Sequence, residues 1–176
     1  MQVLAQGYMS GAIELIQSCL KDNSDRKADV LIYPIFFAMN QGIELYEKSI
    51  CWSLNILLGH KKFYPQNHNI RDIWYIDKEK IKKYGFNEHE GRGEKEFYSM
   101  SEVLEKYLND LYKKIALDDS ISNAFYNIDF CRYPLNKKNN MHFYVKESGN
   151  VVVDLEVYLY VIKDISECLY RYKLYN

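Results

Sequence analysis

Residues 33–59 decide the fold, and they read YPIFFAMNQGIELYEKSICWSLNILLG. Pro near the start and Gly at the end predict a single long helix with these boundaries. At about 100° per residue, apolar side chains cover most of the helix circumference. Such a helix packs on several sides, so we expect it at the centre of the fold. Its broad apolar face is formed by Ile35, Met39, Gly42, Ile43, Tyr46, Ile50, Leu54 and Leu57.

A narrow polar strip runs along nearly the opposite side of this helix. Its members are Asn40, Gln41, Glu44, Glu47, Lys48 and Asn55. Two interpretations are open. The strip is ordinary solvent-facing surface, with Glu44 and Lys48 as a common i,i+4 ion pair. Alternatively, it is a polar site that other elements of the chain close over.

The composition is that of a soluble globular chain. The 176 residues are 48% hydrophobic and 27% charged, enough to bury a core as one domain spanning residues 1–176. The net charge of −1 excludes a nonspecific basic binder as the default and leaves a local RNA site open. Charged residues in the middle of the most apolar segment are costly in lipid, and the N-terminus lacks a signal-peptide pattern. We therefore predict a cytoplasmic protein without membrane contact.

The cysteines and histidines do not form a pattern typical of a metal site. Cys19, Cys51, Cys131 and Cys168 are far apart, without a CxxC pair, and each has apolar neighbours. They are interpreted as reduced core thiols. The four histidines are scattered in the sequence. We predict neither a metal nor a cofactor.

The rest of the chain predicts an all-α protein, an up-and-down bundle of about five helices with one small β-hairpin before the last helix. Few prolines and long segments of helical periodicity favour helices. Alternation around a turn at residues 147–150 predicts the hairpin. The other helices are expected at residues 2–21, at 68–84, from 99 to about 115, and from 154 onward.

Several residues are predicted to begin helices or to allow close packing. His68 lies where a cap of the third helix would, and Asp77 is expected to cap a further turn of it. Ser99 is expected to open a capping box, and Asp154 to cap the last helix. The two glycines of the first helix, Gly7 and Gly11, favour a close approach of another helix.

Arg132 is the cation that most needs an explanation. The standard phosphate-loop, dinucleotide, nucleophile-elbow and HExxH motifs are absent. Arg132 lies within Phe-Cys-Arg-Tyr-Pro, and a guanidinium among apolar residues needs a carboxylate partner or a bound anion. Glu44 is a candidate partner. A buried structural Arg–Glu pair and an anion-binding Arg both remain open.

Three short motifs together resemble the HEPN superfamily (higher eukaryotes and prokaryotes nucleotide-binding). They are QGIELYEK at 41–48, HNIRDIW at 68–74 and FCRYP at 130–134, and the resemblance runs from about residue 33 to the final helix. It implies an all-α bundle that often dimerises through its helices, and a role in phage defence, abortive infection or toxin–antitoxin pairs. Many members are metal-independent ribonucleases with an Arg and a His four to six residues apart. There the His would act on the 2′-hydroxyl and the Arg would stabilise the phosphate.

This chain lacks the catalytic spacing of such ribonucleases. The nearest arrangement is Arg132 followed by His142, with nine residues between them. The resemblance therefore implies the fold, while the ribonuclease activity does not follow from it.

The predicted function is a HEPN-like component of a prokaryotic phage-defence or toxin–antitoxin system, acting as a homodimer or as a subunit of a defence complex. It would bind a nucleotide, RNA or a protein partner at a polar cleft. One alternative is a metal-independent ribonuclease toxin with a rearranged Arg/His site; another is a non-catalytic structural or immunity-type interaction protein. The candidate catalytic residues are His68, Arg132 and His142, and the candidate ligand-binding residues are Gln41, Glu44, Lys48 and Arg71.

Overall fold

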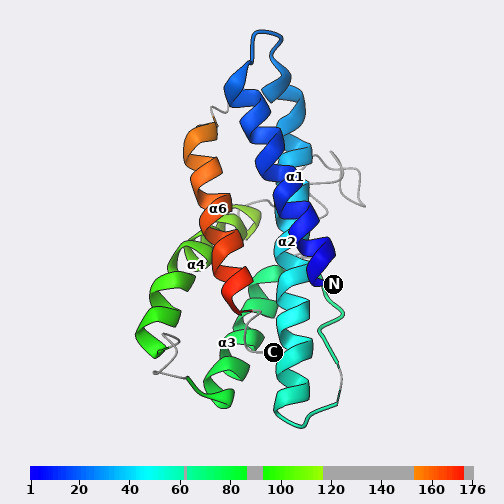
Figure 1. Ribbon diagram of the computed structural model, residues 1–176, viewed down its shortest axis with the longest axis vertical. Helices are drawn as coiled ribbons and strands as arrows, with labels where there is room; N and C mark the ends of the chain where they lie inside the picture. The colour runs from blue at the N-terminus through cyan, green and yellow to red at the C-terminus, as the bar shows by residue number, and fades with distance from the viewer. Residues whose placement is uncertain (62, 87–92, 117–152, 173–176) are drawn as a thin grey trace.

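The computed structural model describes residues 1–61, 63–86, 93–116 and 153–172, and in these it is all-helical (Figure 1). The predicted all-α class is therefore confirmed for this part of the chain, which contains no strand. The predicted hairpin lies outside the described residues, apart from Val153. That residue is in neither a helix nor a strand. The helices are α1 (Gln2–Lys21), α2 (Lys27–Leu57), α3 (Ile70–Tyr84), α4 (Glu94–Ala116) and α6 (Leu155–Tyr172).

Helix α2 is the central element, as predicted, and it packs against α1, α3 and α6. It spans almost the full height of the molecule in Figure 1. It begins at Lys27 rather than at Tyr33, so Pro34 lies inside the helix. The earlier start is held by the turn before it, where the Asn23 side chain accepts the Ala28 N–H at 2.8 Å. Local hydrogen bonding therefore extends α2 beyond the proline that was expected to mark its start.

The close approach between α1 and α2 depends on Gly42. A Cβ added at Gly42 would lie 2.7 Å from the Met9 sulfur and 3.3 Å from the Ala5 carbonyl oxygen. The prediction that Gly7 and Gly11 provide such an approach is wrong, because a Cβ on either would meet no described atom within 4 Å. Gly42, on the apolar face of α2, is the glycine that lets the two helices pack closely.

Helices α2 and α3 run in the same direction, so the helix order departs from a simple up-and-down bundle. The contacts between them follow the same order along both helices. Glu44 contacts His68 just before α3, and Asn55, further along α2, contacts Lys80 near the end of α3. The segment before α3, residues 63–69, lies back along α2, because Phe63 contacts Asn55, Tyr64 packs on Trp52 and His68 reaches Glu44. Helix α4 then runs antiparallel to α3, since Tyr112 contacts the first residue of α3 and Glu105 bonds Lys78 further along.

Three of the predicted caps are wrong and one is confirmed. The N-cap of α3 is Asn69 rather than His68, and its side chain accepts the Asp72 N–H at 3.1 Å. Asp77 lies in the interior of α3, fully buried, and caps nothing. Ser99 is inside α4, which begins five residues earlier. Asp154 caps α6, accepting two backbone N–H groups at 3.0 Å.

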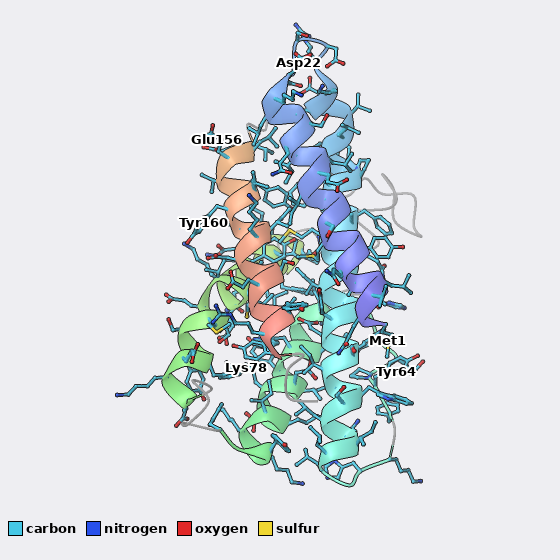
Figure 2. The ribbon with its side chains drawn as sticks, in the orientation of Figure 1. Met1, Asp22, Tyr64, Lys78, Glu156 and Tyr160 are labelled. Atoms are coloured by element: carbon cyan, nitrogen blue, oxygen red, sulfur yellow. The ribbon has the colours of Figure 1, made fainter. Side chains whose placement is uncertain are left out.

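An aromatic cluster joins α3, α4 and α6. The Trp74 ring is fully buried, with its centroid 6.2 Å from that of Phe97 and 5.9 Å from that of Tyr172. The Tyr172 hydroxyl donates to the Phe97 carbonyl oxygen at 2.9 Å. Lys78 lies between α3 and α4 (Figure 2), where its amine bonds Glu105 at 2.6 Å. These contacts fix α3 against the rest of the bundle.

The predictions about the cysteines and about membrane contact can be compared with the described residues. Cys19, Cys51 and Cys168 are buried and unpaired, as expected for core thiols, while Cys131 lies outside the described residues. Burial raises the pKa of the Cys168 thiol to about 12.

Within the described ranges, every helix is too short or too polar to cross a bilayer.

Candidate functional site

The polar strip of α2 is closed over by other elements. Glu44 is 3% exposed and Lys48 is 6% exposed, and both lie among buried neighbours on α2. The interpretation of this pair as ordinary surface is therefore wrong, and the prediction that other elements cover the strip is confirmed for these two residues. A buried ion pair loses its hydration, so its remaining hydrogen bonds matter more than those of a surface pair.

One carboxylate oxygen of Glu44 holds two cationic or ionisable groups. Its Oε1 accepts from the Lys48 amine at 2.8 Å and contacts the His68 Nδ1 at 2.9 Å. An ionised carboxylate only accepts, so Nδ1 is the nitrogen that carries the proton in this contact. The second oxygen, Oε2, is buried and has no hydrogen-bond partner among the described residues. Glu44 therefore fixes the tautomer and the orientation of the His68 ring.

His68 is open to solvent, whereas Glu44 and Lys48 are buried. Its side chain is 52% exposed, whereas that of Lys48 is 8% exposed. Because Glu44 engages Nδ1, the other ring nitrogen, Nε2, is left for a ligand. The backbone at this point is held by the next residue, Asn69, whose side chain bonds the Asp72 backbone and carboxylate. A fixed backbone and a fixed ring edge preorganise His68.

Arg71 is the second cation at the start of α3. Its guanidinium carbon lies 4.8 Å from the centre of the Tyr112 ring, within cation–π range. Its Nε is buried and makes no hydrogen bond to the described part of the chain. The Tyr112 hydroxyl accepts the Ile70 N–H at 3.0 Å, so α4 holds the first turn of α3. Burial, together with the nearby Glu47, raises the pKa of Tyr112.

The loop after α2 covers the other side of Lys48. The Lys48 amine lies 5.8 Å from the centre of the Tyr64 ring, which in turn packs 6.0 Å from the Trp52 ring. Figure 2 shows Tyr64 beside α2. This covering explains how an amine on the polar strip becomes buried, because the loop returns along the helix rather than leaving it.

The structure brings Lys48 and His68 into direct contact with Glu44, and it places Arg71 in the first turn of α3, three residues after His68. Gln41 lies one turn before Glu44 on α2 and is partly buried. Arg132 and His142 lie outside the described residues. The predicted pairing of Arg132 with Glu44 and a catalytic role of His142 therefore stay predictions.

Sequence reasoning missed three residues that shape this site. Asn69 caps α3, Tyr64 covers Lys48, and Tyr112 supports the first turn of α3. Asn beside a predicted helix start is a common N-cap, so Asn69 had a usable signal. Tyr112 falls on the apolar stripe of its helix, where nothing separates it from an ordinary core aromatic residue. Tyr64 lies in a loop whose path is set only by tertiary packing.

The site offers hydrogen-bond donors and positive charge toward an external group. The exposed edge of His68 can accept or donate a proton, and Arg71 is always charged. Buried Glu44 and Lys48 largely compensate each other. Among the described His, Cys, Asp and Glu side chains, no group of three is placed to hold a metal ion. The arrangement is suited to an anionic or hydroxyl-bearing ligand.

Comparison of the chain with protein-family models, with curated proteins and with solved structures gave no match.

Proposed function

We propose that this protein is a cytoplasmic, HEPN-like component of a prokaryotic phage-defence or toxin–antitoxin system, and that it binds a phosphate group of a nucleotide or RNA at His68. The observation that carries the proposal is the geometry of His68, whose Nδ1 is fixed by buried Glu44 while half of the side chain stays exposed. A histidine oriented in this way presents Nε2 in one direction, and in its protonated form it donates from Nε2 to a phosphate oxygen while Nδ1–H stays on Glu44. The sequence motifs that resemble HEPN proteins supply the biological setting.

The ligand class follows from the charges at the start of α3. Arg71 adds a permanent cation in the first turn of α3, three residues after His68, and it is held over the Tyr112 ring. A guanidinium and an imidazole together are typical partners of phosphate oxygens. Lys48 contributes indirectly, because its amine holds the Glu44 carboxylate in place at 2.8 Å. In this proposal Gln41 lines the same side of α2, and the protein acts as a homodimer or as a subunit of a defence complex.

Replacing His68 with Ala is expected to weaken RNA or nucleotide binding about tenfold or more. The loss corresponds to one charge-assisted hydrogen bond, about 1.5–3 kcal/mol. The measurement is a fluorescence-anisotropy titration of purified protein with a labelled single-stranded RNA and with a labelled nucleotide. Arg71→Ala should weaken binding as well.

The matched control is His60→Ala, because His60 is an exposed histidine whose only described side-chain partner is Lys83, at 3.3 Å. Its affinity should equal that of the wild type. Equal affinity of wild type and His68→Ala for every probe that binds would contradict the proposal. Failure of both probes to bind wild-type protein would also contradict it and would favour a protein partner.

A metal-independent ribonuclease is the second candidate, and the same geometry favours it. A ring nitrogen oriented by a carboxylate, with the other nitrogen exposed, is the arrangement of a positioned general base. In this candidate Arg132 acts with His142 or with His68 in a rearranged site. Expression should then arrest growth, and purified protein should cleave RNA in EDTA. His68→Ala should abolish both effects; intact RNA with wild-type protein would exclude this candidate.

A further inference from the structure

Two acidic residues away from His68, Glu47 on α2 and Asp77 on α3, are both fully buried, at 0% exposure. None of their four carboxyl oxygens has a hydrogen-bond partner among the described residues. Asp77 lies close to the Cys51 thiol without forming a hydrogen bond of good geometry, and it contributes with burial to raising the pKa of that thiol to about 12. Two unpartnered carboxyl groups at one helix interface call for an explanation.

The cations nearest to these groups already have other partners. Lys48 bonds Glu44 at 2.8 Å, and Lys80 bonds the Asn55 side-chain oxygen at 2.6 Å. The other ionisable groups that face the pair are Glu44 and Cys51 from α2 and Tyr112 from α4. Among the described residues, no group of three or more His, Cys, Asp or Glu side chains is placed to hold a metal ion. The charge of Lys48 acts to lower the pKa of Glu47, and that of Lys80 acts to lower the pKa of Asp77. Neither amine, however, donates a hydrogen bond to the four carboxyl oxygens.

A buried carboxyl group without a partner is far less costly when it is protonated. We propose that Glu47 and Asp77 hold protons in the folded protein, so that the packing of α3 on α2 weakens as pH rises. This inference goes beyond the proposed function, and it holds whatever His68 binds. It assigns a pH-sensitive contact to the interface that places the start of α3, with Arg71 in its first turn and His68 just before its N-cap.

The direction of the pKa shifts of the two carboxyl groups agrees with this proposal. Burial, then the charges of Asp77 and Glu44, raise the pKa of Glu47 well above its ordinary value of 4.5. Burial raises the pKa of Asp77 well above its ordinary value of 3.8. The unfolded chain would lose these protons near the ordinary values, whereas the folded chain keeps them. Stability is therefore greatest below the ordinary values and is lost as pH rises through the raised folded-state values.

The experiment measures the unfolding equilibrium constant by urea titration from pH 5 to pH 8. In the wild type, each retained proton should raise this constant about tenfold per pH unit. Glu47→Gln and Asp77→Asn should each flatten the dependence, and the double variant should flatten it most. Glu79→Gln is the control, because the Glu79 side chain on α3 is 76% exposed, and it should follow the wild type.

Two outcomes would overturn the inference. One is a double variant that keeps the full pH slope of the wild type, since His68 and other groups would then account for it. If a variant does not fold, carboxyl ¹³C NMR of wild-type protein decides instead. The inference expects protonated Glu47 and Asp77 at pH 7, and two ionised carboxylates at that pH would overturn it. Neither result depends on ligand binding at His68, so a failure here is distinct from a failure of the proposed function.

Discussion

Replacing Lys48 with Met is expected to lower the free energy of unfolding by about 3–5 kcal/mol. The substitution keeps much of the side-chain volume but removes the amine that lies 2.8 Å from Glu44 Oε1. The Glu44 carboxylate, 3% exposed, would then be left with only His68 as a described partner, and with Glu47 nearby. Urea unfolding at pH 7 measures the change.

The control for this prediction is the double variant Glu44→Gln/Lys48→Met, which removes both charges of the pair. Replacing a whole buried ion pair costs much less than breaking it, so the double variant should recover most of the lost stability. A loss below about 1 kcal/mol in the single variant would indicate a solvated surface pair. That result would contradict the closed-over site.

Replacing Trp74 with Ala is expected to cost a similar amount, about 3–5 kcal/mol. Trp74 is fully buried and packs against the rings of Phe97 and Tyr172, so its removal leaves a cavity where α3, α4 and α6 meet. Its indole N–H also donates to Glu105 at 3.4 Å. Thermal and urea unfolding measure the loss.

Two further variants separate cavity formation from other effects at this position. Trp74→Phe keeps an aromatic ring and should cost clearly less than Trp74→Ala. Tyr75→Ala changes the neighbouring residue, which is 46% exposed, and should change stability by only about 0.5 kcal/mol. If Trp74→Ala were as mild as Tyr75→Ala, α3 would not be docked through Trp74 as described.

The sequence was informative where periodicity alone decides the structure. The breadth of the apolar surface on residues 33–59 predicted a central helix, and α2 is that helix. Burial of Asp77 also had a signal, because it lies four residues after Ile73 and four before Ile81, on the buried side of α3. The rule that acidic residues cap helices led to the wrong assignment. The position of Asp77 around the helix axis predicted its burial better than the capping rule did.

What the sequence did not predict depends on contacts between distant segments. The parallel course of α2 and α3 follows from the return of residues 63–69 along α2, and local propensity contains no information on that path. The close approach at Gly42 is set by Met9 on another helix, while Gly7 and Gly11 face open space in the described structure. A glycine's own sequence neighbourhood does not distinguish these cases.

The candidate site was predicted in part for a physical reason. Lys48 follows Glu44 by one helical turn, so any helix at this position brings the two together. The contact between Glu44 and His68 spans 24 positions and does not follow from spacing, although both residues were among the candidate site residues. The roles of Tyr64 and Tyr112 needed the three-dimensional arrangement. Contacts within one helix could thus be predicted, and contacts between elements mostly could not.

The most direct test of the site is the tautomer of His68 in the folded protein, read from a long-range ¹H–¹⁵N NMR spectrum of the imidazole at a pH where it is neutral. The contact with Glu44 predicts a proton on Nδ1 and none on Nε2. Glu44→Ala should lose this preference, whereas His60 should be unaffected in both proteins. A wild-type His68 with its proton on Nε2 would contradict the account, because buried Glu44 would then not hold the ring that we assign to ligand binding.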